Sequence, residues 1–180
     1  MATLPAAPSP SMLLRLTRMV VIRALRDEDV PAVSALCLAA YATAGHFDAN
    51  DAYAASVRDV AGRRGHGDLL IAEEDGVIVG AVMLCSSDSE YAEVSRADEM
   101  EFRFLAVDPQ RWGQGIGESL VMACEEQAHA CGIPAMTICV IDINAAAHRF
   151  YERLGYSRLP ERDWQPRPGV NLLGFQKALD

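Results

Sequence analysis

The stretch that decides the fold spans residues 104–120 and reads FLAVDPQRWGQGIGESL. It begins with an apolar run typical of a strand covered on both faces, and it passes into a helical pattern that starts at Ile116. Between the two lie Gly113, Gly115 and Gly117, which let the backbone turn its N–H groups inward because no Cβ stands in the way. A helix start adds unpaired N–H donors and about half a positive charge. The stretch therefore predicts a strand, a glycine loop and a helix that together bind a phosphate group.

Two familiar phosphate-binding patterns fit this loop poorly. A P-loop requires G-K-[ST] at the start of the helix, whereas this chain has a carboxylate, Glu118, in place of the lysine. A dinucleotide-binding unit requires G-x-G-x-x-G almost at the end of the strand. Here Glu118 occupies the last glycine position, and residues 108–112 separate the strand from Gly113. The sequence thus excludes the P-loop and gives a dinucleotide fold little support.

The remaining patterns predict strands and helices around this stretch. Acidic residues 27–29 favour a helix N-terminus directly after an apolar strand. The pair Asp75-Gly76 separates two apolar runs and tolerates positive φ, as a tight hairpin turn requires. We expect strands at 20–25, 69–72, 77–84, 100–107, 135–141, 156–159 and 170–175, helices from 30, within 50–64, at 116–131 and at 144–153, and a long loop at 86–98.

The length and composition predict one domain. A chain of 180 residues with 51% hydrophobic content can bury enough surface to fold alone, and no linker or internal repeat divides it. Residues 1–18 hold three prolines among small residues, so we expect a flexible tail there and a single domain over 19–180. The true start codon stays open, because Met12 and Met19 offer alternatives to Met1.

The charge and the cysteines restrict the partners. With 16 basic and 25 acidic residues the net charge is −9, which argues against nucleic acid as a partner. No apolar run is long enough for a membrane span. Five cysteines, an odd number without a C-x-x-C pair, argue against disulfides and structural zinc, so we expect a cytoplasmic protein without a metal ion. Cys124, His129 and Cys131 cannot all share one helical face.

Two motifs resemble the GNAT superfamily of acyl-CoA-dependent N-acyltransferases. The first is the glycine stretch with its preceding strand, and the second, in residues 144–156, reads N-x-x-A-x-x-F-Y-E-x-L-G-Y. The family's pyrophosphate loop usually opens with Arg or Gln, whereas this chain has Trp112 at that place, directly after Gln110 and Arg111. The resemblance covers about 160 residues. It implies an α/β fold with a mixed, mostly antiparallel sheet flanked by helices on both faces.

The resemblance also implies the cofactor and its contacts. Acetyl-CoA would be held through its phosphates by the glycine loop and through its pantetheine arm by the backbone of the central strand, as an added strand would be. Backbone N–H groups of that strand would also stabilise the oxyanion that forms at the thioester. The residues implied in cofactor binding are Leu105, Ala106, Val107, Arg111, Trp112, Gly113, Gln114, Gly115, Ile116, Gly117, Asn144 and Phe150. Asn144 fits a helix N-cap equally well.

Acyl transfer to an amine requires two proton movements. The amine arrives protonated near pH 7, since its pKa is about 10 if it resembles lysine, so a base must accept a proton. Glu101 occupies the place from which some family members direct a glutamate; Glu99 and water alone are the alternatives. Tyr151 occupies the place from which the family protonates the leaving thiolate. Arg103 alternates with Glu101 and is expected to pair with a carboxylate or to line the site.

The acceptor is not named by the sequence. The acidic loop at 86–98 suggests a cationic amine such as a polyamine, an aminoglycoside or a peptide amine. Transfer is expected to be direct, in a ternary complex, because no cysteine of the motifs lies at a nucleophile's place. An acyl-CoA sensor of the same fold without catalysis is the alternative. Acyl-chain preference stays open, as does oligomeric state, although homodimers are frequent in such families.

Overall fold

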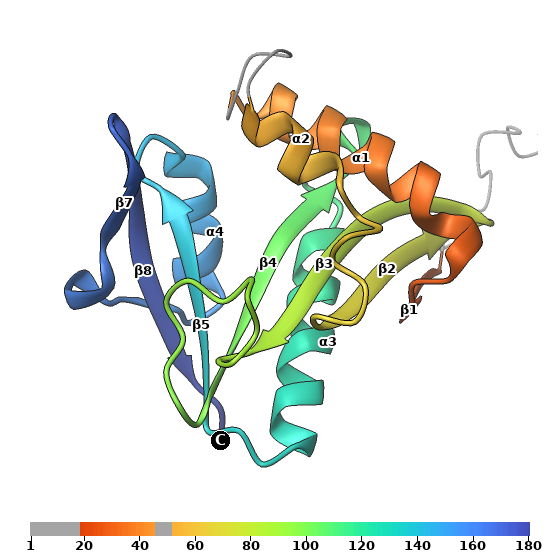
Figure 1. The fold of residues 1–180 in the computed structure, drawn as a ribbon. Coiled ribbons are helices and arrows are strands. Elements are labelled where there is room, and N and C mark those ends of the chain that lie inside the picture. The colour runs from red at the N-terminus through yellow and green to blue at the C-terminus, as the bar shows by residue number, and fades with distance from the viewer. Residues whose placement is uncertain (1–18, 46–51) are drawn as a thin grey trace, which may run out of the picture.

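An eight-stranded sheet forms the middle of the molecule in the computed structural model, which describes residues 19–45 and 52–180 (Figure 1). The expected tail at 1–18 lies outside these residues. The strands follow the order β1-β2-β3-β4-β5-β8-β6, with β7 paired to β8, and only β4 and β5 pair in parallel among the described strands. Their bounds are β1 Val20–Ala24, β2 Asp68–Glu74, β3 Val77–Ser86, β4 Glu99–Val107, β5 Ala135–Ile141, β6 Ser157–Arg158, β7 Trp164–Arg167 and β8 Val170–Ala178.

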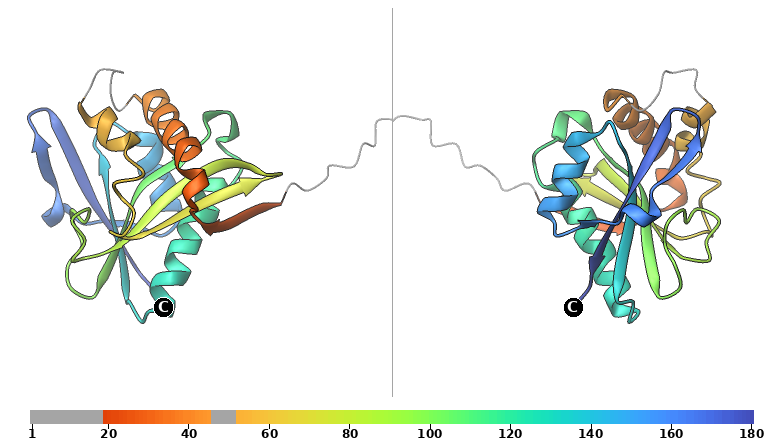
Figure 2. Two further views of the ribbon diagram at one scale, coloured as in Figure 1. Left: turned by 45° about the vertical axis from the view of Figure 1, so that its right-hand side comes forward. Right: turned by 90° about the vertical axis from the view of Figure 1, so that its left-hand side faces the viewer.

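Helices cover both faces of this sheet. Helices α1 (Val30–Thr43) and α2 (Ala52–Arg58) lie on one face, and α3 (Ile116–Ala130) and α4 (Ala145–Arg153) lie on the other (Figure 2). Short 3-10 turns occupy Asp27–Asp29, Pro109–Arg111 and Pro160–Arg162. The expected mixed, mostly antiparallel sheet with helices on both faces is confirmed. No helix of the described chain is long and apolar enough to cross a bilayer.

Two apolar clusters, one on each face, hold the helices to the sheet. The larger packs α3 and α4 against the sheet through residues such as Leu120, Met136 and Phe175, all essentially buried. The smaller packs α1 and α2 through Val33 and Val57. Burial of this kind contributes about 25 cal/mol per Å² of apolar surface, so both helical layers are fixed relative to the central strands.

The central strands β4 and β5 separate along their length. They pair only from Glu99 to Glu101, opposite residues 135–137, and then diverge toward the end where α1 and α2 lie (Figure 1). A bulge in β4 accompanies the divergence. Two observations identify it: Phe104 has a φ of 54°, and the register between β3 and β4 shifts. Phe102 and Leu105 both contact the α3 cluster, which strict alternation would forbid. The bulge thus changes which residues of β4 face α3 just beyond Glu101, the last residue that pairs with β5.

Candidate active site between the diverging strands

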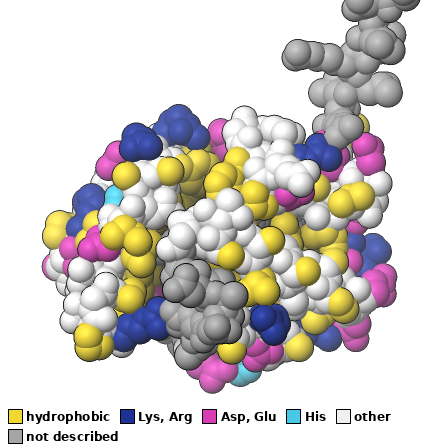
Figure 3. All heavy atoms as spheres, turned by 90° about the horizontal axis from the view of Figure 1, so that it is seen from above, with side chains coloured by type: hydrophobic (Ala, Val, Ile, Leu, Met, Phe, Trp, Pro, Cys, Tyr) yellow, Lys and Arg dark blue, Asp and Glu magenta, His cyan; other side chains and the backbone are white. Residues whose placement is uncertain are grey.

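A cavity of about 1120 Å³ opens between β4 and β5. Residues of α3 and α4 line it from one face of the sheet, and residues of α1 and α2 line it from the other. Figure 3 looks down on the end of the molecule toward which β4 and β5 diverge, where hydrophobic side chains are interspersed with Lys and Arg around the periphery. The cavity can therefore take one ligand from each face and bring the two together between the strands.

The glycine loop has the geometry that its sequence predicts. Gly113 and Gly115 have φ angles of 77° and 83°, a region that other residues adopt only with strain. Gly115 is the residue before α3, and the Ser119 N–H bonds to its carbonyl oxygen at 3.0 Å as the helix begins. At Gly117 an added Cβ would lie 3.4 Å from the Phe150 ring. The N–H donors of this helix start border the cavity, where an anion would meet them.

Eleven of the twelve residues expected to bind cofactor line the cavity. The exception is Gln114, which is exposed and whose side chain donates to the Gln110 carbonyl oxygen at 3.5 Å. Tyr151 lines the cavity too, whereas Glu101 does not occur among the described lining residues. The expected residues on the cavity wall are Leu105, Ala106, Val107, Arg111, Trp112, Gly113, Gly115, Ile116, Gly117, Asn144 and Phe150.

The two large side chains that precede the glycines, Arg111 and Trp112, both bind other residues of the chain. The indole Nε1 of Trp112 donates to the Val107 carbonyl oxygen at 2.9 Å, although the residue is 48% exposed. The Nη1 atom of Arg111 lies 2.7 Å from Oε2 of Glu74, a nearly buried carboxylate at the end of β2. The loop is thus tied to β4 and β2 by its side chains.

Tyr151 and Asn144 lie on the α4 side of the cavity. Burial raises the pKa of the Tyr151 phenol above its ordinary value, so the hydroxyl stays protonated. Its ring packs against Phe102 and Phe150, with centroid distances of 5.8 and 5.0 Å. The Asn144 side chain accepts a 3.0 Å hydrogen bond from the Ala147 N–H, which makes it the N-cap of α4. Asn144 also lines the cavity, so the two interpretations of this residue are compatible.

Glu101 is fully buried and organises the loop before β4. Its Oε2 atom accepts hydrogen bonds from three successive backbone N–H groups, those of Glu93, Val94 and Ser95, at 2.9, 2.8 and 3.0 Å. Its Oε1 atom has no hydrogen-bond partner among the described residues and lies 3.6 Å from Nη1 of Arg103. Burial raises the pKa of Glu101, and the guanidinium and the N–H donors oppose that rise.

Glu99, the alternative base, is held by other side chains. Both Nη atoms of Arg162 donate to its carboxylate, one of them at 2.9 Å, and the Gln176 amide donates at 2.6 Å. Burial raises the pKa of Glu99, but the hydrogen bonds outweigh it, and the net pKa lies below the ordinary value. Glu99 is absent from the described cavity lining. It anchors the 3-10 turn that contains Arg162 to the start of β4.

A second carboxylate, Glu93, reaches the cavity from the loop that Glu101 holds. Its Oε1 atom lies 2.8 Å from Nη2 of Arg103, and its Oε2 atom accepts a hydrogen bond from the Cys139 thiol at 2.9 Å. Glu93, Glu101 and Cys139 bring three possible metal ligands within 4.8 Å of one another. The Arg103 guanidinium contacts both carboxylates, so a fixed cation already occupies their neighbourhood. The expected pairing of Arg103 with a carboxylate is confirmed.

The cavity wall is more positive than the protein as a whole. Of the described residues that line it, four are arginines and two are glutamates, although the chain carries a net charge of −9. The excess of arginine suits an anionic ligand, since a low-dielectric cleft strengthens each interaction. The charged wall residues are Arg103, Arg111, Arg153, Arg167, Glu93 and Glu118.

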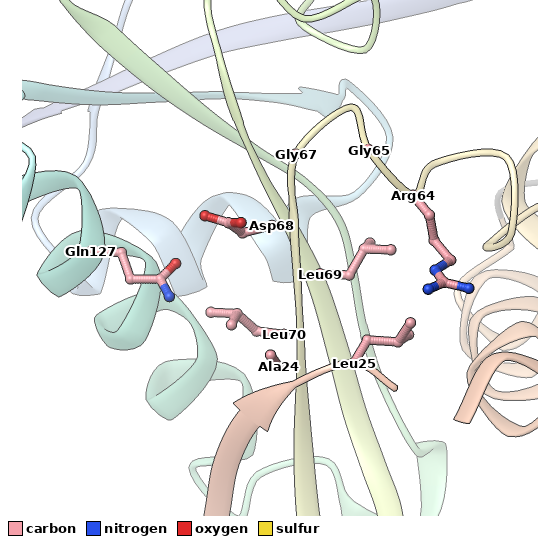
Figure 4. Close-up of a pocket in the computed structure, with 9 residues that line it drawn as sticks. All are labelled: Ala24, Leu25, Arg64, Gly65, Gly67, Asp68, Leu69, Leu70 and Gln127. Atoms are coloured by element: carbon pink, nitrogen blue, oxygen red, sulfur yellow. The ribbon is translucent and has the colours of Figure 1, made fainter. Parts of the chain in front are cut away.

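A second cavity, of about 250 Å³, lies at the other end of β2 (Figure 4). Arg64 and Asp68 point in different directions there, on opposite sides of the strand. Arg64 forms an exposed ion pair with Asp27 instead. The described lining of this cavity brings Asp68 together with no second acid, base or nucleophile, so the opening between β4 and β5 is the candidate active site.

Several residues that line the cavity lie outside the two sequence motifs. Tyr41 and Tyr53 lie on α1 and α2 with their rings 6.3 Å apart, Cys139 lies on β5, and Arg167 lies on β7. Strand β7 was missed because Pro166 lies within it; an edge strand tolerates proline. The only signal for Glu93 is its place in a long acidic loop, and the spacing does not reveal which acid faces the cavity.

Comparison with known proteins identifies similar chains. A family model described as "Acetyltransferase (GNAT) family" matches residues 31–156. A mycothiol acetyltransferase from Nocardiopsis dassonvillei is 35% identical over 77 residues, which are 39% of this chain and 23% of that protein. The chain thus aligns with less than a quarter of that relative's length.

Solved structures share the fold. The ribosomal-protein-S18-alanine N-acetyltransferase from Escherichia coli gives a TM-score of 0.67 at 20% identity, over 90% of this chain and 95% of that one. The PaiA N-acetyltransferase from Thermoplasma acidophilum, in complex with coenzyme A, gives 0.68 at 19% identity, over 89% and 99%. At identities this low, the solved structures support only the shared fold. Membership of the acetyltransferase family rests on the family model.

Proposed function

Because the chain belongs to the GNAT family of acetyltransferases, we propose that it transfers an acetyl group from acetyl-CoA to a primary amine. The observation that carries the proposal is one continuous cavity that contains the glycine loop, the free edge of β4 and the Tyr151 side chain. A cofactor entering from the α3 face and an acceptor entering from the α1 face would meet between the diverging strands.

In this proposal main-chain groups hold the cofactor. The N–H donors at the start of α3 bind its diphosphate, because the loop glycines place no Cβ between backbone and ligand. The edge of β4 from Leu105 to Val107 pairs with the amides of the pantetheine arm. Its N–H groups stabilise the oxyanion that forms at the thioester carbon. The arginine excess on the cavity wall supports binding of the phosphates.

The reaction proceeds by direct attack. The amine nitrogen forms a bond to the thioester carbon, the C–S bond breaks, and the electron pair leaves with sulfur. The amine loses a proton to a carboxylate or to water, and the thiolate gains one. Tyr151 donates the second proton, but a phenol is a weaker acid than a thiol by about 1.5 pKa units in water, and burial widens the difference. Its contribution is therefore modest. Glu101 contributes through the loop that it anchors.

The compartment, the acceptor and the oligomeric state are also proposals. All five cysteines are free thiols, which is consistent with action in a reducing cytoplasm. The relative is named a mycothiol acetyltransferase, but the shared segment is too short to transfer a substrate from that name. A homodimer stays a prediction.

The test is release of free CoA from acetyl-CoA over a panel of primary amines, followed by mass spectrometry of the product. We expect amine-dependent release and a product heavier by one acetyl group. Tight binding of acetyl-CoA without turnover of any amine would favour the sensor interpretation instead.

A further inference from the structure

We propose that the Glu93 carboxylate binds the ammonium group of the acceptor and accepts its proton. We further propose that the acceptor is an apolar amine with a single positive charge. The inference rests on the proposed function and deepens it. It assigns Glu93 a direct contact with the acceptor, and it makes Glu101 a positioning residue that acts through the backbone of the loop.

Glu93 lies where the two central strands part. The last parallel pair joins Glu101 of β4 to Thr137 of β5. Two residues further along each strand lie Arg103 and Cys139, and the Glu93 carboxylate contacts both, at 2.8 and 2.9 Å. The carboxylate therefore bridges β4 and β5 at the floor of the cavity. An amine that attacks a thioester held between these strands must approach this point.

The loop that carries Glu93 is fixed by buried contacts. Its residues 93–95 donate three N–H groups to one oxygen of Glu101. The Val94 carbonyl oxygen accepts from Arg162 at 2.9 Å, and the Tyr91 carbonyl oxygen accepts from Arg103 at 2.6 Å. The Glu93 side chain is only 24% exposed. A carboxylate held in this way is positioned before the acceptor arrives, which lowers the entropic cost of the reaction.

The local charge suits one ammonium group. Glu93 and Glu101 share one ion-pair partner among the described residues, the Arg103 guanidinium. Arg162 also acts on Glu101 but is paired with Glu99, so one negative charge remains when both carboxyls are ionised. Two other acids of the loop have partners outside the cavity: Asp88 accepts from the Ser86 hydroxyl, and Glu90 pairs with His66. Among the described loop residues only Glu93 lines the cavity. A polyamine or an aminoglycoside would bring several cations to a wall that already carries four arginines.

Apart from Ser56 of α2 and Arg167 of β7, the part of the cavity wall that α1, α2, β7 and β8 contribute is apolar or aromatic. Helices α1 and α2 contribute Tyr41 and Tyr53, and β8 contributes Val170 and Leu172. Such a wall buries an aliphatic or aromatic body at about 25 cal/mol per Å². The acceptor class that follows is an alkylamine or arylalkylamine, with its ammonium group at Glu93 and its body against α1 and α2.

The test compares Glu93→Gln with Glu90→Gln, an acid of the same loop outside the described cavity lining. With phenethylamine we expect Glu93→Gln to lower kcat/KM about 100-fold at neutral pH, the range for loss of a general base. The deficit should shrink as pH approaches the amine pKa of about 10, where the acceptor arrives deprotonated. Glu90→Gln should match the wild type, and both variants should bind acetyl-CoA with wild-type affinity by calorimetry.

The second part of the test compares two amine substrates. Wild-type kcat/KM for phenethylamine should exceed that for spermine at least about tenfold, a difference of about 1.4 kcal/mol. Equal rates for Glu93→Gln and wild type, a deficit that does not change with pH, or a preference for spermine would overturn this inference alone. Absence of turnover with every amine by the wild type would overturn the proposed function, and this inference with it.

Discussion

The indole N–H of Trp112 donates a 2.9 Å hydrogen bond to the backbone carbonyl oxygen of Val107. This contact joins the glycine loop to the end of β4 and crosses the turn between them. Trp112 therefore fixes the loop, and in the proposed binding mode the phosphates are bound by main-chain donors. A rigid loop is what a ligand held by main-chain donors requires.

Trp112→Phe tests this tie. The substitution keeps an aromatic ring and removes the donor, and one hydrogen bond contributes about 1 kcal/mol net. We expect the Kd for acetyl-CoA to rise about fivefold in a calorimetric titration. Trp164→Phe, on β7 and outside the described cavity lining, is the matched control and should leave the Kd unchanged. An unaltered Kd for Trp112→Phe would remove the role assigned to the indole.

The glycine conformation gives a second prediction. Gly115→Ala places a Cβ at a φ of 83°, which costs about 1 to 2 kcal/mol or forces the loop to move. Since the displaced N–H donors are those proposed to bind the diphosphate, we expect acetyl-CoA affinity to fall about 5- to 30-fold. Gly132→Ala, at a φ of 73° after α3, should lower stability similarly without weakening binding. Equal affinities for the two variants would contradict the proposed phosphate loop.

The phenol of Tyr151 is predicted to assist the leaving group modestly. Tyr151→Phe should lower the single-turnover rate a few-fold, roughly 1 kcal/mol in the barrier, because the thiolate can also leave without a proton. Tyr156 packs against Tyr151 and donates from its hydroxyl to Glu125 at 2.8 Å, and it is not part of the described cavity lining. Tyr156→Phe should therefore reduce stability but not the rate. An undiminished rate for Tyr151→Phe, with chemistry limiting, would exclude the role.

Stability at acid pH depends on Asp29. The hydrogen bond from Arg23, opposed by burial and aided by the Arg26 N–H, lowers the pKa of this nearly buried carboxyl to about 2. A carboxyl with a lowered pKa stabilises the fold above its unfolded pKa of about 3.9, and the stabilisation is lost as pH falls toward about 2. Asp29→Asn should reduce the free energy of unfolding at pH 7 by about 2 kcal/mol. Urea unfolding from neutral to acid pH should show a flatter loss for the variant; a parallel loss would disprove the assignment.

Much of the fold could be predicted because local signals agreed with the tertiary structure. Asp75 and Gly76 both have positive φ, as the hairpin turn requires, and β5 begins and ends at the expected residues. The second helix ends at Arg58, and beyond it Arg63 folds back to the carbonyl oxygens of Ser56 in α2 and of Asp59 just after it, with its guanidinium 3.9 Å from the centre of the Phe104 ring. A contact of that kind joins distant segments and leaves no trace in periodicity.

The candidate site also has a part that the sequence predicts and a part that it does not. The glycine loop is a local feature, so its spacing together with the family resemblance located its residues, and of the residues expected to bind cofactor only Gln114 is absent from the described cavity lining. The role expected of Glu101 depended on a family position, whereas its carboxylate accepts three backbone N–H groups of a loop that no periodic pattern describes. The acid that reaches the cavity, Glu93, is placed by those bonds, which follow neither a helical nor a strand period.

The most direct measurement is a calorimetric titration of the purified chain with acetyl-CoA and, in parallel, with acetyl-pantetheine, which lacks the diphosphate. The account predicts one binding site for acetyl-CoA and an affinity for acetyl-pantetheine at least about 100-fold weaker, equivalent to about 2.7 kcal/mol. No heat of association with acetyl-CoA, or equal affinities for the two thioesters, would contradict it.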